Sequence, residues 1–505
     1  MSDTQIFKNL NKNEEYLKKT IGSCIDTQYR HISVKALGDC DALLVYIRKM
    51  VKEELLERFV VEPLKNVDKL EVNKPVIINK DNMQKLVDYE IVVLNSKEVT
   101  DWVSVCDAVI SGDSVLFLEK SNTALIVSTK GWDSRAISEP VTEGEVRGPR
   151  DGFIEDVNTN ISLIRRRIRD YGLRFEYMKI GERTKTDIYL AYIEGIVNET
   201  NLQELRQRLK RIKIDAIIGS GYVEEFIEDN SFTIFPLIDH TERPDKACSA
   251  ILEGRIIVLV DNAPYVMIVP TVFWQYLQAP GDYYERPYVG TFARWIRFLG
   301  LFLSMSVSSF YVLLSSYHQE MIPTPLALNI AGGREGVPFP AVVEALSMEI
   351  LFEVLREAGI RMPRPIGQTV SIVGALVVGQ AAVAAGLVGP SLIIVIAISA
   401  ISSFALPSYS MGNALRILRF PMIILSSVLG LVGYLLGIIV VALHLMSLRS
   451  FGVPFLSPLI PFDKSGNQDV LVRLPWWKML KRPPFSRSKD TYRQKNGLRP
   501  GPKKR

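Results

Sequence analysis

The residues with the clearest chemical potential lie in one segment, Pro340–Ile360, which reads PAVVEALSMEILFEVLREAGI. When each residue is advanced by about 100°, as in an α-helix, the charged side chains Glu349, Glu353, Arg356 and Glu357 gather on one arc and the apolar ones lie mostly opposite. Two interpretations stay open. The helix lines a water-filled pore or the centre of an oligomer, or it lies on a membrane surface with Glu353 and Arg356 as an ordinary pair along the helix.

Residue patterns typical of catalysis or cofactor binding are absent. The four histidines show no metal-binding spacing, and the sequence contains no P-loop, no G-x-G-x-x-G after a strand and no G-x-S-x-G elbow. Asp39-Cys40-Asp41 has no companion ligands, so a helix cap with a buried thiol is favoured over a metal site. The four cysteines are scattered and form no CxxC pair. We therefore predict no catalytic site, no cofactor and no metal.

Two tracts in the second half of the chain predict membrane spans. No Asp, Glu, Lys or Arg occurs in Phe298–Tyr317, and between Ile366 and Leu448 the only charged residues are Arg416 and Arg419. A bilayer-crossing helix needs about 20 mostly apolar residues. The sequence therefore predicts a polytopic membrane protein with a first span at 298–317 and later spans near Gln368–Val388, Ser391–Ser408 and Phe420–Met446.

The basic residues beside these spans predict their orientation. Arg294 and Arg297 precede the first span, and Arg449 with a basic tail follows the last, so both ends are expected on the cytoplasmic side. Four full spans satisfy this arrangement. If Pro340–Ile360 also crosses, the number becomes odd unless a further segment, such as Ile322–Ile330, dips in and returns.

Residues 1–290 alternate helical and strand-like patterns, which indicates an α/β arrangement. Helices are expected at Glu53–Glu57 and Leu202–Arg211, and strands at the segments EIVVL (90–94), SVLFL (114–118), ALIVS (124–128), KTDIYLAYIEGIV (185–197) and IKIDAIIG (212–219). A stretch rich in Gly, Pro and acids, 138–149, reads as a linker. It separates a first soluble subdomain, 1–137, from a second, 150–290. The N-terminus lacks a signal peptide, so this half is expected to stay in the cytoplasm.

Two features of the second subdomain have candidate roles. Arg165, Arg166, Arg167 and Arg169 spread around one helix, which favours a solvated or salt-bridging face between domains over a nucleic-acid patch. Further on, two apolar strands flank the turn Asp261-Asn262-Ala263-Pro264. Because this hairpin ends just before the membrane segments, Asp261 and Pro264 are candidate coupling residues.

The net charge of +5 is a sum of unlike parts. From Lys464 to Arg505 there are 13 basic and two acidic residues, a net +11, which leaves −6 for residues 1–463. We expect a membrane domain at 291–449 and a basic cytoplasmic tail at 450–505 that lies near anionic lipid headgroups. The fold class expected is an integral membrane α-helical bundle of four to six membrane segments, preceded by a cytoplasmic α/β domain of two subdomains. Nucleic-acid binding is not expected.

Several long tracts carry a resemblance to a known family. They are GPRDGFIEDVNTNISLIRRRIR (148–169), TERPDKACSAILEGRIIVLVDNAPYVMIVP (241–270), APGDYYERPYVGTFARWIR (279–297), REGVPFPAVVEALSMEILFEVLREAGIRMPRPIGQTVSIVGALVVGQAAVAAGLVGP (334–390) and SLRSFGVPFLSPLIP (447–461). They occur in order over most of the chain from Gly148 onward. The sequence resembles the A subunits of the GerA-type spore germinant receptors of endospore-forming bacteria.

The resemblance implies a function. Such A subunits are expected in the spore inner membrane, with the N-terminal domain and the tail on the core side. They assemble with a transporter-like B subunit, which holds the nutrient, and a C subunit lipoprotein. The implied activity is a nutrient-gated pore, formed by an A-subunit homo-oligomer, that releases monovalent cations and triggers germination.

The same resemblance favours the pore interpretation of Pro340–Ile360. As a hypothesis, Glu344, Glu349 and Glu353 form a cation-favouring lining, because rings of carboxylates raise the local cation concentration. Arg356, Gln368 and Gln380 are further lining or gating candidates, and Gly332, Gly333 and Gly336 are a candidate hinge in the expected loop Asn329–Phe339.

Two alternatives compete with a pore. In one, this chain is itself a secondary transporter of the nutrient, although no internal repeat is visible. In the other, it is a membrane scaffold that only couples its partners. Ion current would identify the pore, and labelled nutrient crossing the bilayer would identify the transporter.

Overall fold

The computed structural model describes residues 5–22, 24, 26–34, 40–65, 96–131, 139–140, 142–362 and 377–501. It divides into two compact units. Unit 1 comprises residues 1–228, 238–270 and 479–505, and unit 2 comprises residues 229–237 and 271–478. The expected strand at 90–94 lies outside the described residues.

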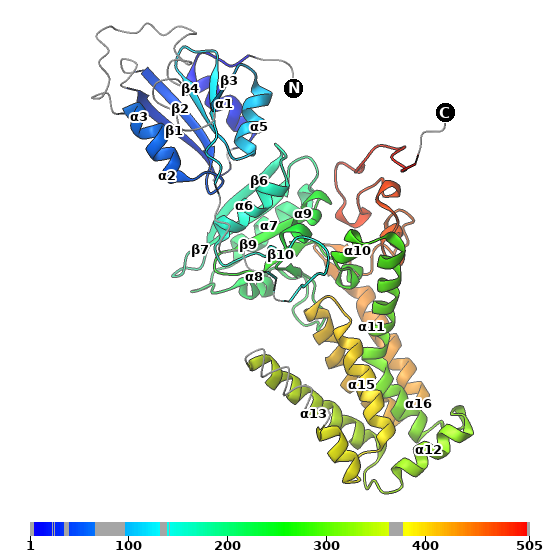
Figure 1. Cartoon of the computed structure of the whole chain (residues 1–505). Helices are drawn as coiled ribbons and strands as arrows, with labels where there is room; N and C mark the ends of the chain where they lie inside the picture. Colours follow the sequence, from blue (N-terminus) through cyan, green and yellow to red (C-terminus); the bar gives the residue numbers. More distant parts are fainter. Residues whose placement is uncertain are drawn as a thin grey trace. The chain divides into compact units, whose positions relative to one another are not determined.

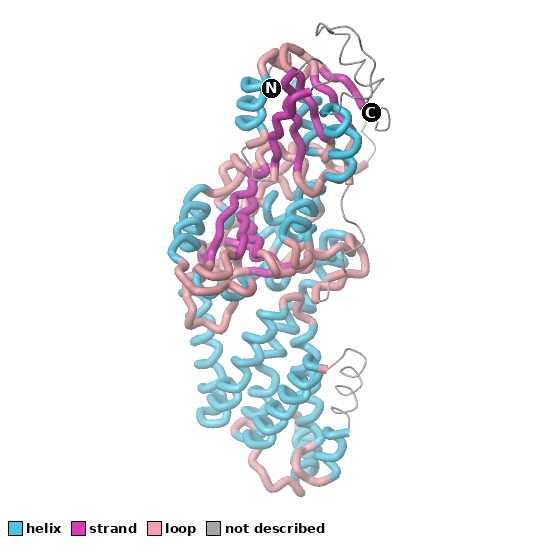
Figure 2. The backbone as a smooth tube through the Cα atoms, turned by 90° about the vertical axis from the view of Figure 1, so that its left-hand side faces the viewer, coloured by secondary structure: helices cyan, strands magenta, loops and turns pink. Residues whose placement is uncertain are grey.

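Unit 1 contains two antiparallel five-stranded sheets, which confirms the expected N-terminal α/β domain (Figures 1 and 2). The first sheet has the order β1-β2-β4-β5-β3. Its strands are β1 (Thr27–Val34), β2 (Cys40–Ile47), β3 (Ser96–Val99), β4 (Ser114–Leu118) and β5 (Ala124–Val127). Alternate residues of β2 face opposite sides, as the pleat of a strand requires.

Helices cover both faces of this sheet. Leu43 and Val45 pack toward α1 (Leu10–Thr20) and α5 (Trp102–Ile110), whereas Leu44 packs with the helical run of α2 (Glu53–Leu56), the π-helical turn η2 (Glu57–Val61) and α3 (Glu62–Lys65). Because both faces are covered, β2 and β4 are apolar along most of their length. This explains why the segment SVLFL predicted β4 correctly.

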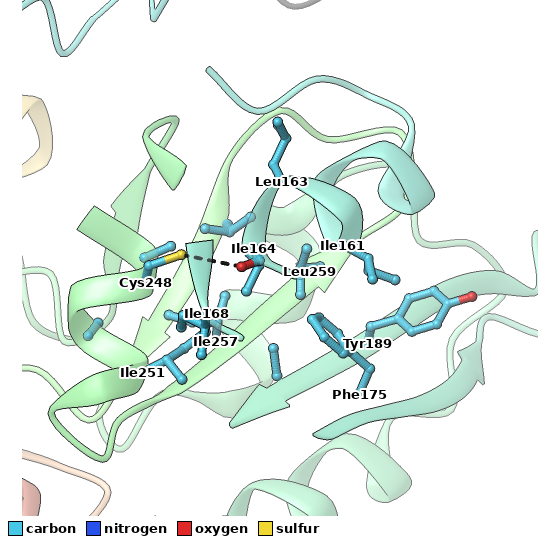
Figure 3. Packing of buried hydrophobic residues seen from close by; sticks show 14 of the residues in the cluster. Ile161, Leu163, Ile164, Ile168, Phe175, Tyr189, Cys248, Ile251, Ile257 and Leu259 are labelled. Atoms are coloured by element: carbon cyan, nitrogen blue, oxygen red, sulfur yellow. Dashed lines mark hydrogen bonds between the residues drawn. The ribbon is translucent and has the colours of Figure 1, made fainter. Parts of the chain in front are cut away.

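The second sheet has the order β6-β7-β9-β10-β8. Its strands are β6 (Leu173–Ile180), β7 (Thr186–Ile193), β8 (Asp239–Thr241), β9 (Ile256–Val260) and β10 (Val266–Val269), and its helices are α6 (Val157–Arg167), α7 (Glu199–Arg211), α8 (Ser220–Ile227) and α9 (Pro244–Leu252). Ile161 and Ile164 of α6 and Ile251 of α9 pack over Phe175 and Leu259 (Figure 3). The expected hairpin around Asp261–Pro264 is confirmed as the β9–β10 pair.

The expected strand at 212–219 is wrong. This segment has no ladder partner and instead runs along the β6–β7 turn, where the backbone N–H of Glu182 donates to the carbonyl of Ile214 at 2.9 Å. The hydroxyl of Thr186 also donates to the carbonyl of Ile217 at 2.7 Å. Ile212 and Ile217 are buried, whereas Ile218 is exposed, so the segment is an irregular stretch along this turn and not a strand of the sheet.

The arginine-rich helix α6 joins the two sheets of unit 1. Arg165 is 1% exposed, and its guanidinium donates to the Asp26 carboxylate at 2.7 and 3.1 Å. Arg167 pairs with Asp151. These contacts support the predicted salt-bridging role of this helix.

The expected linker 138–149 is held by charges in its described part. The Glu143 carboxylate accepts from Lys246 at 3.1 Å, and the Glu143 carbonyl accepts from Arg243 at 3.1 Å. These contacts attach it to β8 and α9 of the second sheet.

The basic tail divides between the units. Residues 479–501 lie on unit 1, where Arg482 donates to the Leu252 carbonyl at 2.8 Å and Arg493 pairs with Glu253 at 3.1 Å. The backbone N–H of Lys489 also donates to the Ile196 carbonyl at 3.1 Å. Unit 1 therefore includes the tail from residue 479 onward, although a single tail at 450–505 was expected. Residues 271–290 belong to the helical unit, although they were expected in the second subdomain.

Unit 2 is a helical bundle. Its longer helices are α11 (Pro287–Ser316), α12 (Thr324–Arg334), α13 (Ala341–Arg361), α15 (Pro390–Phe404) and α16 (Tyr409–Ser447), with a further helical stretch at 377–384. Figure 1 shows α11, α15 and α16 packed side by side. Among the described residues, α11 and α16 are long and apolar enough to cross a membrane.

The helix α16 folds back on itself at Gly430. This residue has φ 60° and ψ −137°, a backbone conformation that residues other than glycine rarely adopt. A Cβ on Gly433 would overlap the Leu425 carbonyl, and one on Gly437 would overlap the Met422 sulfur. In a continuous helix, residues eight apart lie about 12 Å apart along the axis. Residues 409–429 and 431–447 are therefore two antiparallel helices, and the single span expected at Phe420–Met446 is wrong.

Candidate functional site in the helical unit

The candidate site is the charged face of α13, which is turned into unit 2. Glu344 and Glu349 are 1% and 0% exposed, whereas Ile350 and Val354 on other faces are 54% and 59% exposed. This is the reverse of a surface helix of a soluble protein. Charged groups inside and apolar groups outside are what a membrane environment requires.

Glu344 lies at the N-terminal end of α13 and joins three elements. One carboxylate oxygen accepts from Arg334 of α12 at 2.8 and 3.1 Å, and the other accepts from the backbone N–H of Gly389 at 3.0 Å. Gly389 precedes the first residue of α15. Glu344 therefore holds the ends of α12 and α15 against α13.

Glu349, in the middle of α13, forms a fully buried ion pair. Its Oε2 accepts from Arg419 of α16 at 2.5 Å, and its Oε1 accepts from the Ser308 hydroxyl of α11 at 2.6 Å. Arg419 is 1% exposed and also donates to the Ser304 carbonyl at 2.9 Å. This cluster joins α11, α13 and the first half of α16.

Glu353 lies one turn further along α13, beside a cavity. Its Oε2 accepts from Arg356 at 3.0 Å and from Arg416 of α16 at 3.4 Å. The cavity between α13 and α16 has a volume of about 750 Å³. Its polar lining consists of Glu353, Arg356, Glu357, Arg361, Asn413 and Arg416, and apolar side chains such as Phe420 complete it.

The other predicted site residues are placed less centrally. Gln380 is exposed in the helical stretch 377–384, and Gln368 lies outside the described residues. Gly332 and Gly333 lie inside α12, whereas a loop was expected there, and Gly336 follows in the turn. A Cβ on Gly333 would lie 3.3 Å from the Pro390 ring, so this glycine permits a close approach between α12 and α15.

The coupling candidates belong to unit 1. Asp261 Oδ1 accepts from the backbone N–H of Val157 at 3.4 Å, at the start of α6. Asn262, with φ 63°, donates its backbone N–H to the Glu155 carbonyl at 2.9 Å. The turn that contains Pro264 is therefore tied to the N-terminus of the arginine-rich helix.

Sequence reasoning missed the basic partners of the glutamates. Arg334, Arg416 and Arg419 received no role, although Arg416 and Arg419 are the only charges in a long apolar tract. In such a tract a charge needs a partner, and three acids at the spacing of α13 were available. That pairing signal was present in the sequence.

No metal-binding group of three or more His, Cys, Asp or Glu side chains occurs among the residues that the structure describes. The four cysteines are buried and unpaired with one another. Burial raises the pKa of the Cys106 and Cys248 thiols to about 12. Such thiols stay protonated at neutral pH and serve as packing groups.

Comparisons with known proteins agree over nearly the whole chain. A family profile described as Bacillus/Clostridium GerA spore germination protein matches residues 15–485. Spore germination protein KA of Bacillus subtilis (strain 168) is 44% identical over 497 residues, which cover 98% of this chain and 90% of that protein. The uncharacterized membrane protein YfkQ of the same organism is 40% identical over 495 residues, covering 98% and 93%.

Among solved structures, the chain aligns with the crystal structure of the N-terminal domain of the A subunit of the Bacillus megaterium spore germinant receptor GerK3. The TM-score is 0.43 at 32% sequence identity, and the alignment covers 54% of this chain and 99% of that one.

Proposed function

Because the chain belongs to the GerA family of Bacillus and Clostridium spore germination proteins, we propose that it is the A subunit of a nutrient germinant receptor. In this proposal it lies in the spore inner membrane with a transporter-like B subunit and a lipoprotein C subunit. Several copies form a pore that conducts monovalent cations when the nutrient binds. The chain acts as a receptor subunit and not as an enzyme.

The orientation of α13 is the observation that supports a pore most strongly. Its carboxylates and the guanidiniums of Arg416 and Arg419 lie inside unit 2, and its apolar side chains are exposed. Charged residues at membrane depth usually mark an ion pathway or face a water-filled cavity.

The reversal at Gly430 supports a multi-pass topology. With α11, α13, the expected span Gln368–Val388, α15 and both halves of α16, the number of crossings is even. An even number keeps unit 1 and the tail on the same side, as the flanking basic residues favour. If α13 crosses and α16 is a single span, the number of membrane crossings is odd. The reversal at Gly430 adds one crossing and makes the number even.

Coupling from unit 1 to the pore is part of the proposal. The β9–β10 hairpin with Asp261 and Pro264 ends at Val269, and unit 2 begins at Thr271. Movement of β10 therefore reaches α11 through the 17 residues from Pro270 to Arg286. Gly333 lacks a side chain and so permits the close approach of α12 to Pro390 of α15, and added Cβ atoms on Gly332 and Gly336 would meet nothing within 4 Å; these glycines are the hinge at which the two elements shift during opening.

Reconstitution of the receptor complex in liposomes tests the proposal. Addition of nutrient is expected to produce a cation current. Labelled nutrient crossing the bilayer without such a current would favour a transporter, and the absence of both would leave a scaffold.

A further inference from the structure

The cavity between α13 and α16 has an excess of basic side chains on an otherwise apolar lining. Its ionisable residues are three arginines and two glutamates, namely Arg356, Arg361, Arg416, Glu353 and Glu357. Apart from Asn413, the other described lining residues are apolar. The volume of about 750 Å³ lies within the usual range of ligand pockets, about 300–1,000 Å³. An apolar cavity with a net positive charge suits an anionic group attached to an apolar body.

The two glutamates of the lining each have an arginine partner on α13. Glu353 Oε2 accepts from Arg356 at 3.0 Å, and the Oε1 atom of this residue is buried. Glu357 Oε1 accepts from Arg361 at 2.7 and 2.9 Å. Because each carboxylate is offset by an arginine of its own helix, the positive charge of Arg416 is left over.

Arg416 also offers the cavity a free donor. Its side chain is only 6% exposed. Nε donates to the Gly412 carbonyl at 3.3 Å, and Nη1 donates to Glu353 Oε2 at 3.4 Å. Nη2 has no acceptor among the described residues and is not fully enclosed. A guanidinium N–H in such a place needs an acceptor, and its planar geometry matches the oxygens of a phosphate.

The basic lining lies toward one end of the helical unit. At the other end, the Tyr317 hydroxyl after α11 donates to the Ser427 carbonyl at 2.7 Å, just before the reversal at Gly430. Arg416 lies about 20 Å before Gly430 along the helix axis. It is therefore nearer the end of the bundle where α11 begins, which is the cytoplasmic end in the proposed topology.

The C-terminal end of α13 lies further in the same direction. Successive acids along α13 meet successively earlier arginines of α16, so these two helices are antiparallel. Arg356 and Arg361 are therefore closer than Arg416 to the cytoplasmic end. Basic pockets between membrane helices on the cytoplasmic side are places where the headgroups of anionic lipids bind.

We propose that the α13–α16 cavity binds a phospholipid with an anionic headgroup. The headgroup phosphate accepts from Arg416 Nη2 and lies among the arginines at the end of α13. An acyl chain lies along Ile350 and Ile417, which are both 54% exposed and open the cavity to the bilayer. This assignment rests on the membrane placement in the proposed function and not on the pore.

Native mass spectrometry of the detergent-solubilised full chain tests the proposal. The chain is titrated with phosphatidylglycerol and, separately, with phosphatidylcholine, and the fraction that carries lipid gives an apparent Kd. Arg416→Gln removes the free donor, Arg361→Gln removes a charge at an exposed position, and Ile417→Trp fills the apolar part. Arg449→Gln and Ile424→Trp are the matched controls, because they make the same changes at exposed residues outside this lining.

The wild-type chain and both controls are expected to prefer phosphatidylglycerol over phosphatidylcholine. Each arginine variant should lower that preference about fivefold, the contribution of one basic residue at a membrane surface. Ile417→Trp should weaken the binding of both lipids. If Arg416→Gln does not accumulate, the other two variants decide.

Two results would overturn the site: equal affinity of the wild-type chain for the two lipids, or unchanged lipid binding in the cavity variants. Tight binding of inorganic phosphate in place of phosphatidylglycerol would identify a free anion as the ligand and overturn the lipid. The titrations need neither nutrient nor the other subunits. Failure of lipid binding therefore leaves the pore standing, whereas a reconstituted receptor without current overturns the proposed function and not this site.

Discussion

The buried charged residues of the helical unit form ion pairs, and the pairing determines whether each one joins helices or stays free to contact a ligand. Glu349 and Arg419 are 0% and 1% exposed, with hydrogen bonds from Ser308 and to the Ser304 carbonyl. Taking two charges out of water is costly, and their attraction offsets that cost only when the remaining polar atoms are satisfied. The pair therefore specifies how α13 meets α16 and contributes little to net stability.

Removing one partner of this pair should be far worse than removing both. Arg419→Met leaves a buried carboxylate unpaired, which is expected to cost about 3–5 kcal/mol. The double variant Glu349→Leu with Arg419→Met should recover most of that loss, because an apolar pair needs no solvation. The melting temperature of the detergent-solubilised chain measures both.

The exposed pair Glu357 and Arg361 is the control, since its side chains are 57% and 78% exposed. Neutralising both should change stability by less than about 1 kcal/mol. If Arg419→Met and the double variant Glu349→Leu with Arg419→Met lower the melting temperature equally, the proposed pairing of Glu349 with Arg419 is contradicted. Glu349→Gln should likewise lower receptor abundance, because it leaves the buried Arg419 without its charged partner.

The buried thiols of unit 1 allow a prediction about reactivity. Because burial raises the pKa of Cys106 and Cys248 to about 12, both stay protonated at pH 8. In a chain with Cys24→Ser and Cys40→Ser, labelling by Ellman's reagent at pH 8 should be about a hundredfold slower than after denaturation. Fast labelling of the folded chain would show that these thiols are accessible or ionised.

At the residue scale, the sequence predicted which acids matter but not how they are used. The arc of α13 placed Glu349 and Glu353 on one face, because helical spacing is local information. Their arginine partners on α16, Arg416 and Arg419, lie 63 and 70 positions away, so this pairing depended on tertiary packing. Both carboxylate oxygens of Glu349 accept hydrogen bonds, whereas among the described residues only Oε2 of Glu353 has partners. This difference is visible only in the tertiary contacts.

At the scale of elements, the reversal of α16 is the feature that most changes the topology. Gly433 and Gly437 are four apart, the spacing of a GxxxG contact, which lets two helix backbones approach closely. They pack on Leu425 and Met422 of the first half. Hydropathy could not reveal this, because apolar residues continue through the turn and only the glycine pattern marks it.

A cross-link tests the reversal directly. Cysteines introduced as Met422→Cys and Gly437→Cys should be joined by a short bifunctional reagent, because the two halves lie antiparallel. In a continuous helix these positions would be about 22 Å apart. The control combines Met411→Cys with Gly437→Cys in a chain that also carries Met422→Ala, so that the new Cβ does not meet the Met422 sulfur, and it should not cross-link. Failure of the first pair in well-expressed protein would rule out the antiparallel arrangement.

Glycine substitutions give a second test at this scale. Gly433→Ala places a Cβ against the Leu425 carbonyl and should lower the melting temperature. Gly332→Ala in α12 meets nothing within 4 Å and should be neutral or stabilising by about 0.5–1 kcal/mol. The opposite order of effects would contradict the described packing of both helices.

The strands of unit 1 show where element prediction works and where it stops. β4 and the β9–β10 pair were recognised from short apolar runs, because both sheet faces are covered and the strands are apolar throughout. Residues 212–219 had the same appearance but pair with no strand of the sheet in the structure. Strand formation depends on a partner, and a single sequence does not identify one.

At the scale of the whole molecule, the chain crosses between its two units several times, at 228–229, 237–238, 270–271 and 478–479. The tail was expected to lie near lipid headgroups. In the structure, Arg482 and Arg493 of the tail bind the α9–β9 turn of unit 1. Net charge predicted a basic tail correctly, but not that a protein surface holds part of it.

Docking of the tail should be visible by limited proteolysis. Arg493→Glu is expected to release the tail and speed tryptic cleavage after residue 478, because it places two acids together at Glu253. The swap Arg493→Glu with Glu253→Arg should restore protection, and Lys495→Glu, at an exposed position, should have no effect. Equal cleavage rates in all variants would contradict docking.

The central claim concerns the whole receptor, in which copies of this chain form a cation pore that opens when nutrient binds. The most direct test is the ion current of the reconstituted three-subunit complex before and after nutrient addition. We predict a current that appears only with nutrient and is carried by monovalent cations. A complex with intact subunits and bound nutrient that passes no current would contradict the account.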